Sequence, residues 1–355
     1  MTRHFLEVDD LSRSELAEVM DLAAERDYPQ LLARQGVALL FEKPSARTRN
    51  STEVAVFQLG GHPVTIRGEE VGLDTREPAE DVARVLAGYH AAIGGRVIDH
   101  HTLERMVAAI DDAGMTVPVF NLLSDLAHPC QAVADVLTIK EALGGTEGVH
   151  IAYVGDGNNM ARSLARAAAL VGASITLATP EGYSLPAADI EAVRAIGGSI
   201  EVTTQPEEAV KGADVVYTDV WTSMGQEAEA QARRAAFTGF MVDQHLIDLA
   251  SPDVAVMHCL PAHRGEEISA EVVDGPRSVV WHQAANRMHS VRGLIAWLIT
   301  HAGEKGTAAG GAGAPAQAEE AGRRGPAGEK GTDAGGAGAP AQAEEAGRRG
   351  PAGEK

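Results

Sequence analysis

Short runs of β-branched and aliphatic residues recur along the first 300 residues and alternate with segments in which apolar residues are three or four positions apart. Runs of this length that are apolar almost throughout are typical of strands buried on both faces of a sheet. The spacing of three and four is typical of helices that cover such a sheet. The strand-like runs are VALLF (37–41), VPVF (117–120), HIAYVGD (150–156), SITLAT (174–179), SIEVT (199–203), VVYTDV (215–220), VAVMHCL (254–260) and SVVW (278–281).

Three segments show the helical spacing most clearly. The first, 48–59, is expected to turn Val54 and Phe57 inward, and the others are 78–89 and 284–300. The apolar positions of these last two are Val82, Val85, Leu86 and Tyr89, and Val291, Leu294, Ile295 and Leu298. Alternating strands and helices predict an α/β fold with two doubly wound parallel-sheet domains joined by interdomain helices, followed by a disordered C-terminal tail.

The same alternation suggests where the chain divides. We expect a first domain at residues 1–145 and a second at 146–283, because a glycine pair interrupts the pattern between them. The helix at 284–301 is expected to pack back on the first domain. Residues 302–355 have a different composition and form the tail.

The tail contains a repeat of 25 residues. The segment at 303–327 recurs at 328–352 with one difference, Ala308 becoming Asp333. Neither copy contains Leu, Ile, Val, Phe, Met or Trp, so the tail cannot bury enough apolar surface to offset the entropy lost on ordering. We therefore predict a disordered, low-complexity segment.

Charge and composition exclude several classes of protein. A net charge of -20 argues against a nucleic-acid partner, since nucleic-acid-binding proteins carry a basic face that displaces counterions from phosphates. Two cysteines, Cys130 and Cys259, are too few for a disulfide framework. The N-terminus lacks the features of a secretory signal, and no stretch approaches the roughly 20 apolar residues of a membrane span. These features favour a cytoplasmic protein without a membrane partner.

One stretch is basic within this acidic chain. FEKPSARTRNSTE (41–53) combines Lys43, Arg47 and Arg49 with four hydroxyl side chains, and it follows a predicted strand and opens a predicted helix. Unpaired N–H groups and the positive end of the helix dipole meet at such a junction, which suits a phosphate. The alternative is a capped helix start with arginines on the surface.

Three further clusters lie where predicted strands end or predicted helices begin. HPCQ (128–131) offers His128 as a donor and Gln131 as an amide of either polarity. GDGNNMARSLARAA (155–168) resembles a dinucleotide loop, but Met160 stands where its third glycine should be. DVWTSMGQE (219–227) mixes apolar and polar groups in a way that suits a small zwitterion.

A last cluster, MHCLPAHRGEE (257–267), raises the question of a metal. His258 and Cys259 are adjacent and alternate between the faces of a strand, which makes joint ligation awkward. We expect no metal site. The G-x-S-x-G motif of a serine nucleophile is absent from the sequence.

Together these motifs resemble those of the ornithine carbamoyltransferases. SARTR (45–49), HPCQ, DVWTSMGQE, HCLPAHRGEE (258–267) and AANR (284–287) occur in the order and approximate spacing of that family. The resemblance extends from about His4 to Leu298 and leaves only the tail outside. SMG followed by HCLP separates the ornithine enzymes from the aspartate carbamoyltransferases.

The resemblance implies transfer of a carbamoyl group from carbamoyl phosphate to the δ-amine of L-ornithine, giving L-citrulline and phosphate in arginine biosynthesis, without a cofactor. Arg47, His128 and Arg287 would stabilise the carbonyl oxygen, and Cys259 would orient the δ-amine and help to deprotonate it. The residues implied for carbamoyl phosphate are Ser45, Ala46, Arg47, Thr48, Arg96, His128, Gln131, Cys259, Leu260 and Arg287, and those for ornithine are Asn159, Asp219, Ser223 and Met224.

Three expectations and two alternatives complete the picture. The resemblance implies a homotrimer or a multiple of trimers, and a mobile SMG loop that closes over ornithine. Ala285 replaces a glutamate common in the family; if that acid orients Arg287, carbamoyl phosphate would bind more weakly here. The alternatives are a carbamoyltransferase for another amine and a catalytically weak binding protein of the same fold. The sequence does not separate an anabolic from a catabolic role.

Overall fold

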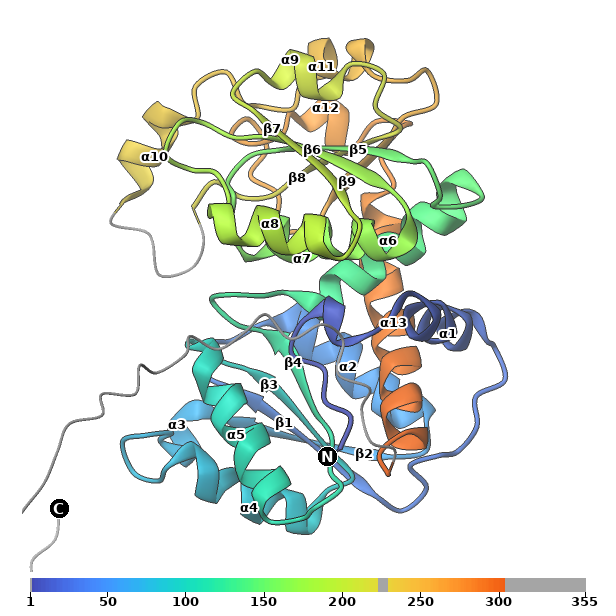
Figure 1. The fold of residues 1–355 in the computed structure, drawn as a ribbon, viewed down its shortest axis with the longest axis vertical. Helices are drawn as coiled ribbons and strands as arrows, with labels where there is room; N and C mark the ends of the chain where they lie inside the picture. Colours follow the sequence, from blue (N-terminus) through green and yellow to red (C-terminus); the bar gives the residue numbers. More distant parts are fainter. Residues whose placement is uncertain (1, 223–228, 304–355) are drawn as a thin grey trace, which may run out of the picture. The chain divides into compact units, whose positions relative to one another are not determined.

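Two parallel β-sheets organise residues 2–222 and 229–303, the part of the chain that the computed structural model describes (Figure 1). The first sheet has the strand order β2-β1-β3-β4 and the second the order β7-β6-β5-β8-β9, with every neighbouring pair parallel. The strands are β1 Gly36–Phe41, β2 His62–Arg67, β3 Ala92–Arg96, β4 Val119–Leu123, β5 His150–Val154, β6 Ser174–Ala178, β7 Ser199–Thr203, β8 Val215–Thr218 and β9 Ala255–His258.

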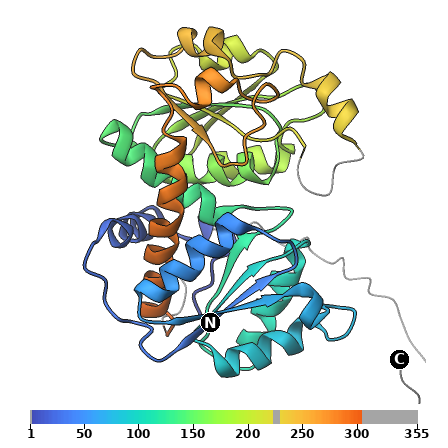
Figure 2. The same ribbon diagram turned by 180° about the vertical axis from the view of Figure 1, so that it is seen from behind.

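Helices cover both faces of each sheet. In the first sheet α4 and α5 lie on one face, and α2 crosses the other face beside α13, as the view from behind shows (Figure 2). In the second, α7 and α8 lie on one face and α9, α11 and α12 on the other (Figure 1). The helices are η1 Val8–Asp10, α1 Arg13–Ala24, α2 Ala46–Gln58, α3 Gly68–Val71, α4 Ala79–Tyr89, α5 His100–Asp112, α6 Pro129–Leu143, α7 Asn159–Val171, α8 Ala187–Ala195, α9 Pro206–Val210, α10 Ala230–Ala236, α11 Gln244–Leu249, α12 Ala270–Val273 and α13 Val280–Thr300.

The predicted fold class is confirmed: both sheets are parallel and both are doubly wound. Helices α6 and α13 pack against each other. Helix α13 also contacts α1, α2 and strand β9, so it touches helices on the side of the first sheet and a strand of the second. The described residues fall within one compact unit, and the predicted division at residues 145 and 283 stays a prediction. The tail from residue 304 onward lies outside the described residues.

The strand order places a switch point in each sheet. Chain connections leave in opposite directions between β1 and β3 in the first sheet and between β5 and β8 in the second. Ligands of open α/β sheets bind outside the carboxyl ends of the strands at such a point. The segments after β1, β3, β5 and β8 are therefore the places to look for a site.

Seven of the eight predicted strand runs contain or overlap a strand. The prediction for 278–281 is wrong: Ser278 forms only an isolated bridge to Val256, and Val280 already begins α13. Two strands were missed. β2 is an edge strand that contains Pro63, and β3 contains a pair of glycines.

Two inward-facing predictions are also wrong. Val54 and Phe57 on α2 are exposed, Phe57 by 73%, and the buried face of this helix carries Thr48, Thr52, Ala55 and Val56 instead. On α4, Val82 and Leu86 are buried as predicted, whereas Val85 and Tyr89 are exposed. Among the described residues, no helix is both long enough and apolar enough to cross a membrane.

Candidate active site

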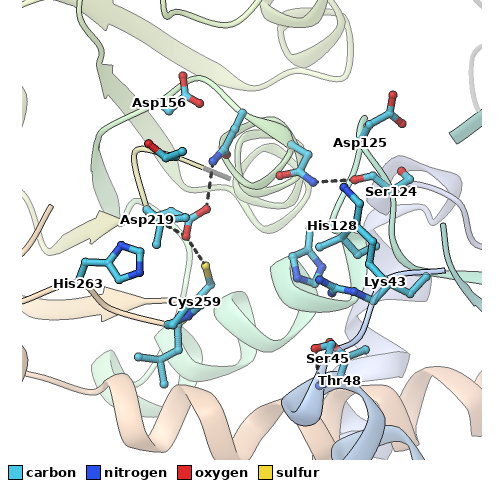
Figure 3. Close-up of a pocket in the computed structure, with 18 of the residues that line it drawn as sticks. Lys43, Ser45, Thr48, Ser124, Asp125, His128, Asp156, Asp219, Cys259 and His263 are labelled. Carbon is cyan, nitrogen blue, oxygen red and sulfur yellow. Dashed lines mark hydrogen bonds between the residues drawn. The ribbon is translucent and has the colours of Figure 1, made fainter. Parts of the chain in front are cut away.

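A cavity of about 1440 Å³ opens where the carboxyl ends of both sheets' strands meet. Its lining comes from the β1–α2 junction, the ends of β3, β5, β8 and β9, the start of α6, and α13. Figure 3 shows two groups facing each other across it, with Lys43 and His128 in one and Asp219 and Cys259 in the other. A cavity of this size can take two small, highly polar molecules together.

The β1–α2 junction forms a capped helix N-terminus that lines the cavity. Ser45 is the N-cap, and its Oγ accepts the backbone N–H of Thr48 at 3.3 Å while its hydroxyl donates to Thr48 Oγ1 at 3.0 Å. Ala46 and Arg47 follow in the first turn, and the Arg47 side chain is exposed to the cavity. Arg49 points elsewhere and forms an ion pair with Glu53. Of the two arginines in this turn, only Arg47 lines the cavity.

Two more arginines reach the same place from distant parts of the chain. Arg96 ends β3 and Arg287 lies on α13, both are buried, and the Nε atom of each has no hydrogen-bond partner among the described residues. Burial lowers the pKa of Arg96 to about 10, with repulsion from Arg287 and Arg47 as further causes. None of these three arginines forms an ion pair within the described residues. The guanidinium groups thus repel one another around a space that favours an anion.

His128 borders the same space as the N-cap residue of α6. Its backbone N–H donates to Ser163 Oγ at 3.0 Å, and that hydroxyl donates to the buried carboxylate of Glu7 at 2.8 Å. The ring Nδ1 is buried and has no partner among the described residues. Burial, followed by repulsion from Arg287 and Arg96, lowers the pKa of His128 well below its usual range. The ring is therefore neutral at pH 7 and can donate a single N–H to a carbonyl oxygen.

Gln131 lies behind the cavity wall instead of lining it. Its Oε1 accepts a hydrogen bond from Arg287 Nη1, and its Nε2 donates to Asp135 at 2.7 Å. The other amino group of Arg287 donates to Thr48 Oγ1 at 3.2 Å. The structure therefore brings Gln131 into contact with the arginine cluster but does not expose it to the cavity.

The β5–α7 turn supplies two asparagines. Asn158 caps α7, its Oδ1 accepting the N–H groups of Met160 and Ala161, and its Nδ2 donates to Asp219 at 3.1 Å. Asn159, the residue implied for ornithine, lines the cavity and donates to the Ser124 carbonyl at 2.7 Å. Asn158 was not among the residues implied for ornithine, although it is adjacent to Asn159 in the GDGNN motif.

Asp219 follows β8, and Cys259 and Leu260 follow β9. The thiol of Cys259 donates to Asp219 Oδ1 at 2.9 Å. Burial raises the pKa of Cys259 well above its usual range, and the charge of Asp219 raises it further. Cys259 is accordingly a neutral thiol in this state. Leu260 adopts φ +60°, and its N–H donates to His258 Nδ1 at 2.9 Å.

The predicted lid falls on residues that are not described. Ser223 and Met224 lie outside the described residues, so their predicted contacts with ornithine remain predictions. Trp221, just before them, is buried and stacks on Phe237. The sequence also did not reveal that Arg233 of α10 pairs with Asp156 at 2.9 Å beside the cavity.

Two side-chain clusters in the described part of the chain could hold a metal by distance alone. One is Asp219, His258 and Cys259, and the other is His263, Glu266 and Glu267. In the first, the thiol already donates to Asp219, and His258 Nδ1 already accepts from Leu260. Each of these three candidate ligands already has a hydrogen-bond partner in the protein, so nothing in the arrangement requires an ion. The absence of a metal remains a prediction.

Comparisons with known proteins agree with this geometry. Residues 3–141 match the carbamoyl-phosphate-binding domain of aspartate/ornithine carbamoyltransferases, and residues 147–298 match the aspartate/ornithine-binding domain of the same family. The ornithine carbamoyltransferase of Acidothermus cellulolyticus is 50% identical over 315 residues, covering 86% of this chain and 99% of that protein. The anabolic ornithine carbamoyltransferase of Pyrococcus furiosus is 48% identical over 275 residues, covering 76% and 85%. A solved structure of the ornithine carbamoyltransferase from Pyrococcus furiosus superposes with a TM-score of 0.80 at 44% identity, covering 86% of this chain and 98% of that one.

Proposed function

This chain belongs to the aspartate/ornithine carbamoyltransferase family, and we infer that it transfers the carbamoyl group of carbamoyl phosphate to the δ-amine of L-ornithine. The products are L-citrulline and phosphate, and the citrulline serves arginine biosynthesis. One observation carries the assignment: Arg47, Arg96 and Arg287 surround one space without an ion-pair partner among the described residues. A phosphate dianion is the ligand that such a cluster favours.

Carbamoyl phosphate is proposed to bind on what we call the phosphate side of the cavity, made of residues 45–48, Arg96, His128 and Arg287. Its phosphate would accept the N–H groups of the first turn of α2, including that of Ala46, and the hydroxyls of Ser45 and Thr48. The arginines would supply planar pairs of donors to its oxygens. The support is that all these groups line the cavity.

The carbonyl oxygen becomes negative as the amine attacks. His128 is neutral and lines the cavity, so its ring N–H can donate to this oxygen, with Arg47 and Arg287 adding positive charge. The Leu260 carbonyl and Gln131 Oε1 would hold the carbamoyl NH2. Gln131 Oε1 already accepts from Arg287, and because an amide oxygen has two lone pairs it would accept the carbamoyl NH2 as a second donor.

Ornithine is proposed to bind on the ornithine side, made of Asn158, Asn159, Asp219 and Cys259, with Ser223 and Met224. Asp219 would pair with the α-ammonium. That pairing would also remove a cause of the raised pKa of Cys259, because the carboxylate charge next to the thiol would be neutralised. Orienting the δ-amine is therefore the first role of Cys259, and a role in its deprotonation begins only once ornithine is bound.

In the reaction a nitrogen–carbon bond forms between the δ-amine and the carbonyl carbon. The carbon–oxygen bond to phosphate breaks, phosphate leaves with the bonding electrons, and the amine nitrogen loses a proton. No electron carrier is involved, so we propose that the enzyme needs no cofactor. Holding both substrates in line can lower such a barrier by roughly 7–11 kcal/mol.

The assembly and location of the enzyme are part of the proposal. Val54, Phe57, Val85 and Tyr89 expose apolar side chains on α2 and α4, which supports burial of these helices in a homotrimer or a multiple of trimers. A fully active monomer in light scattering would contradict this. We propose a cytoplasmic enzyme with domains at 1–145 and 146–283, the helix at 284–301 packing on the first.

The test is citrulline formation from carbamoyl phosphate in parallel assays with ornithine, putrescine, N-acetylornithine and aspartate. Turnover with ornithine alone is the expected result. Turnover with another amine would keep the phosphate side and overturn the roles given to Asp219 and the ornithine side. No turnover with any amine would favour the binding-protein alternative.

A further inference from the structure

A buried carboxylate between the two sides of the cavity has no role in the proposed chemistry. Asp135 lies in α6 with no exposed surface and does not line the cavity. Its Oδ1 accepts two hydrogen bonds, from Gln131 Nε2 at 2.7 Å and from Gln283 Nε2 at 2.8 Å. Its Oδ2 accepts the hydroxyl of Tyr217 at 3.0 Å. It forms no ion pair within the described residues.

The chemistry of these groups fixes which way the two glutamines face. A carboxylate only accepts hydrogen bonds, and an amide donates from one end and accepts at the other. Both NH2 ends must therefore turn to Asp135, since the reverse would set amide oxygens against carboxylate oxygens. Both amide oxygens consequently point away from Asp135, in different directions.

The first oxygen points to the phosphate side. Gln131 Oε1 accepts from Arg287 Nη1, and the same arginine donates from Nη2 to Thr48 Oγ1 at 3.2 Å. Arg287 is buried, so a reversed Gln131 would direct an NH2 group at a cation with no acceptor in between. The orientation of Gln131 thus keeps Arg287 in contact with the first turn of α2.

The second oxygen points to the ornithine side. Gln283 Oε1 accepts the backbone N–H of His258 at 2.9 Å. His258 ends β9, immediately before Cys259, and its ring Nδ1 accepts the N–H of Leu260 at 2.9 Å. The orientation of Gln283 therefore fixes the backbone from which the Cys259 thiol and the Leu260 carbonyl project.

Resting on the proposed function, we propose that Asp135 is a positioning residue whose Oδ1 acts as the common acceptor that orients Gln131 toward the phosphate side and Gln283 toward the ornithine side. Asp135 touches neither substrate. Its effect on the reaction passes through Arg287 on one side and through residues 258–260 on the other. What matters is the acceptor oxygen at this position, not the negative charge.

Three variants of the full chain separate the parts of this proposal. Asp135→Asn keeps an oxygen for both amides and can donate to Tyr217, so the Kd for carbamoyl phosphate and kcat should stay within about threefold of wild type. Asp135→Leu leaves the buried NH2 group of Gln131 unpaired and leaves that of Gln283 with the Tyr217 hydroxyl alone, which should weaken carbamoyl phosphate binding by about 10–100-fold and lower kcat as well. Gln283→Leu interrupts only the ornithine side, so kcat should fall about tenfold with carbamoyl phosphate affinity unchanged.

The measurements are calorimetric titration with carbamoyl phosphate alone, steady-state kinetics, and thermal unfolding to establish that each variant is folded at the assay temperature. Tyr217→Phe is the matched control. It removes the hydroxyl that donates to Asp135 Oδ2 and that accepts from Gln283 Nε2 at 3.2 Å, and it leaves Asp135 Oδ1 in place as the acceptor for both glutamines. It should stay within about threefold of wild type in both constants.

A folded Asp135→Leu protein with wild-type affinity and kcat would overturn the proposal. If that variant does not fold, the other two decide. A tenfold loss of carbamoyl phosphate affinity in Asp135→Asn would show that the negative charge matters and not the acceptor oxygen. If Gln283→Leu causes no selective loss of kcat, the proposed effect of Asp135 on the ornithine side is wrong. A wild-type chain that binds carbamoyl phosphate but makes no citrulline would instead refute the proposed function. The two failures are distinguishable because calorimetry measures carbamoyl phosphate binding without any turnover.

Discussion

The phosphate side and the ornithine side of the cavity hold their polar groups in opposite ways. On the phosphate side, Arg47, Arg96 and Arg287 have no ion-pair partner among the described residues, and His128 keeps an unpartnered ring nitrogen. On the ornithine side, Asp219 already accepts hydrogen bonds from the Cys259 thiol, from Asn158 and from the backbone of Val220.

This difference has a consequence for binding. An anion that enters the phosphate side gains new interactions and relieves repulsion between cations, with few protein contacts to break. Ornithine must first replace contacts that Asp219 makes with the protein itself. The phosphate side is therefore arranged to bind carbamoyl phosphate directly, whereas the ornithine side must exchange protein contacts for contacts with ornithine.

The largest effect should come from removing one of the three arginines on the phosphate side that have no ion pair within the described residues. Arg47→Ala should lower kcat/KM by about a thousandfold, since a preorganised donor to the developing charge is lost. The folded state should be unaffected, because Arg47 is exposed and has no ion pair within the described residues. Steady-state kinetics and thermal unfolding provide the measurement.

Arg49→Ala is the matched control for that change. It removes the same charge two residues further along α2, where the side chain pairs with Glu53 outside the cavity. Its kcat/KM should stay within about threefold of wild type, because exposed ion pairs contribute little. Equal losses in the two variants would show that general positive charge, and not the Arg47 position, matters.

The next effect concerns the ornithine side. Asp219→Asn should raise KM for ornithine by about a hundredfold, because the α-ammonium loses its charged partner, and carbamoyl phosphate affinity should stay unchanged. Asp125→Asn removes a carboxylate from the same cavity without touching Cys259, and it should change KM for ornithine by less than about threefold. A similar rise in both variants would contradict a specific pairing at Asp219.

A smaller effect is expected in the reactivity of Cys259. Its pKa is raised well above the usual range by burial and by Asp219, so the thiolate fraction at pH 8 should be lower than in the unfolded chain and alkylation should be slower. Alkylation by iodoacetamide between pH 7 and 10, followed by mass spectrometry of the Cys259 peptide, measures this.

Asp219→Asn should lower the pKa of Cys259 and speed its alkylation, because the charge of Asp219 is removed while burial and the charge of Asp135 still raise the pKa. Cys130 is an internal reference that should not respond: burial raises its pKa to about 12, and Asp219 is not among the causes. Alkylation of wild-type Cys259 as fast as in the unfolded chain would contradict a neutral thiol.

The smallest effect should be that of Ala285→Glu. The side chain of Ala285 is exposed and stands two positions before the buried Arg287, so the two point to different sides of α13. A glutamate there would not contact Arg287 within one chain, and KM for carbamoyl phosphate should stay within about twofold. A clear change in either direction would restore the idea that this position acts on the phosphate side.

The sequence predicted the fold class because strands buried on both faces of parallel sheets are apolar throughout, as in 150–154 and 174–178. It missed β3 because Gly94 and Gly95 look like a loop. A Cβ at either would stand 2.5 Å from a neighbouring side chain, so packing against Phe120 and Leu103 requires glycine there. The pattern cannot show this, since the contacts come from residues far along the chain.

The inward orientation of Val54 and Phe57 failed for a related reason. Apolar spacing marks one face of a helix, but it does not say whether that face meets the sheet or another surface. The buried face of α2 carries Thr48 and Thr52, and the hydroxyl of Thr48 accepts a hydrogen bond from Arg287. The buried face of α2 therefore carries polar residues where the apolar spacing had led us to expect apolar ones.

The motifs could be found in the sequence because they lie at strand ends and helix starts, and parallel strands end at one edge of a sheet. The roles of their residues stay predictions. The partners of these residues were not predictable. Gln131 meets Arg287, 156 positions later in the chain, and Gln283 meets Asp135, 148 positions earlier. Such pairs are set by how α6 and α13 pack, which the local sequence does not record.

The most direct test of the difference between the two sides is calorimetric titration of the substrate-free full chain with each substrate separately. We predict that carbamoyl phosphate binds without ornithine, that this binding weakens with added salt and is lost in Arg47→Ala, and that ornithine alone binds far more weakly. Ornithine binding as tightly alone as carbamoyl phosphate does, together with unchanged carbamoyl phosphate binding in Arg47→Ala, would contradict the account.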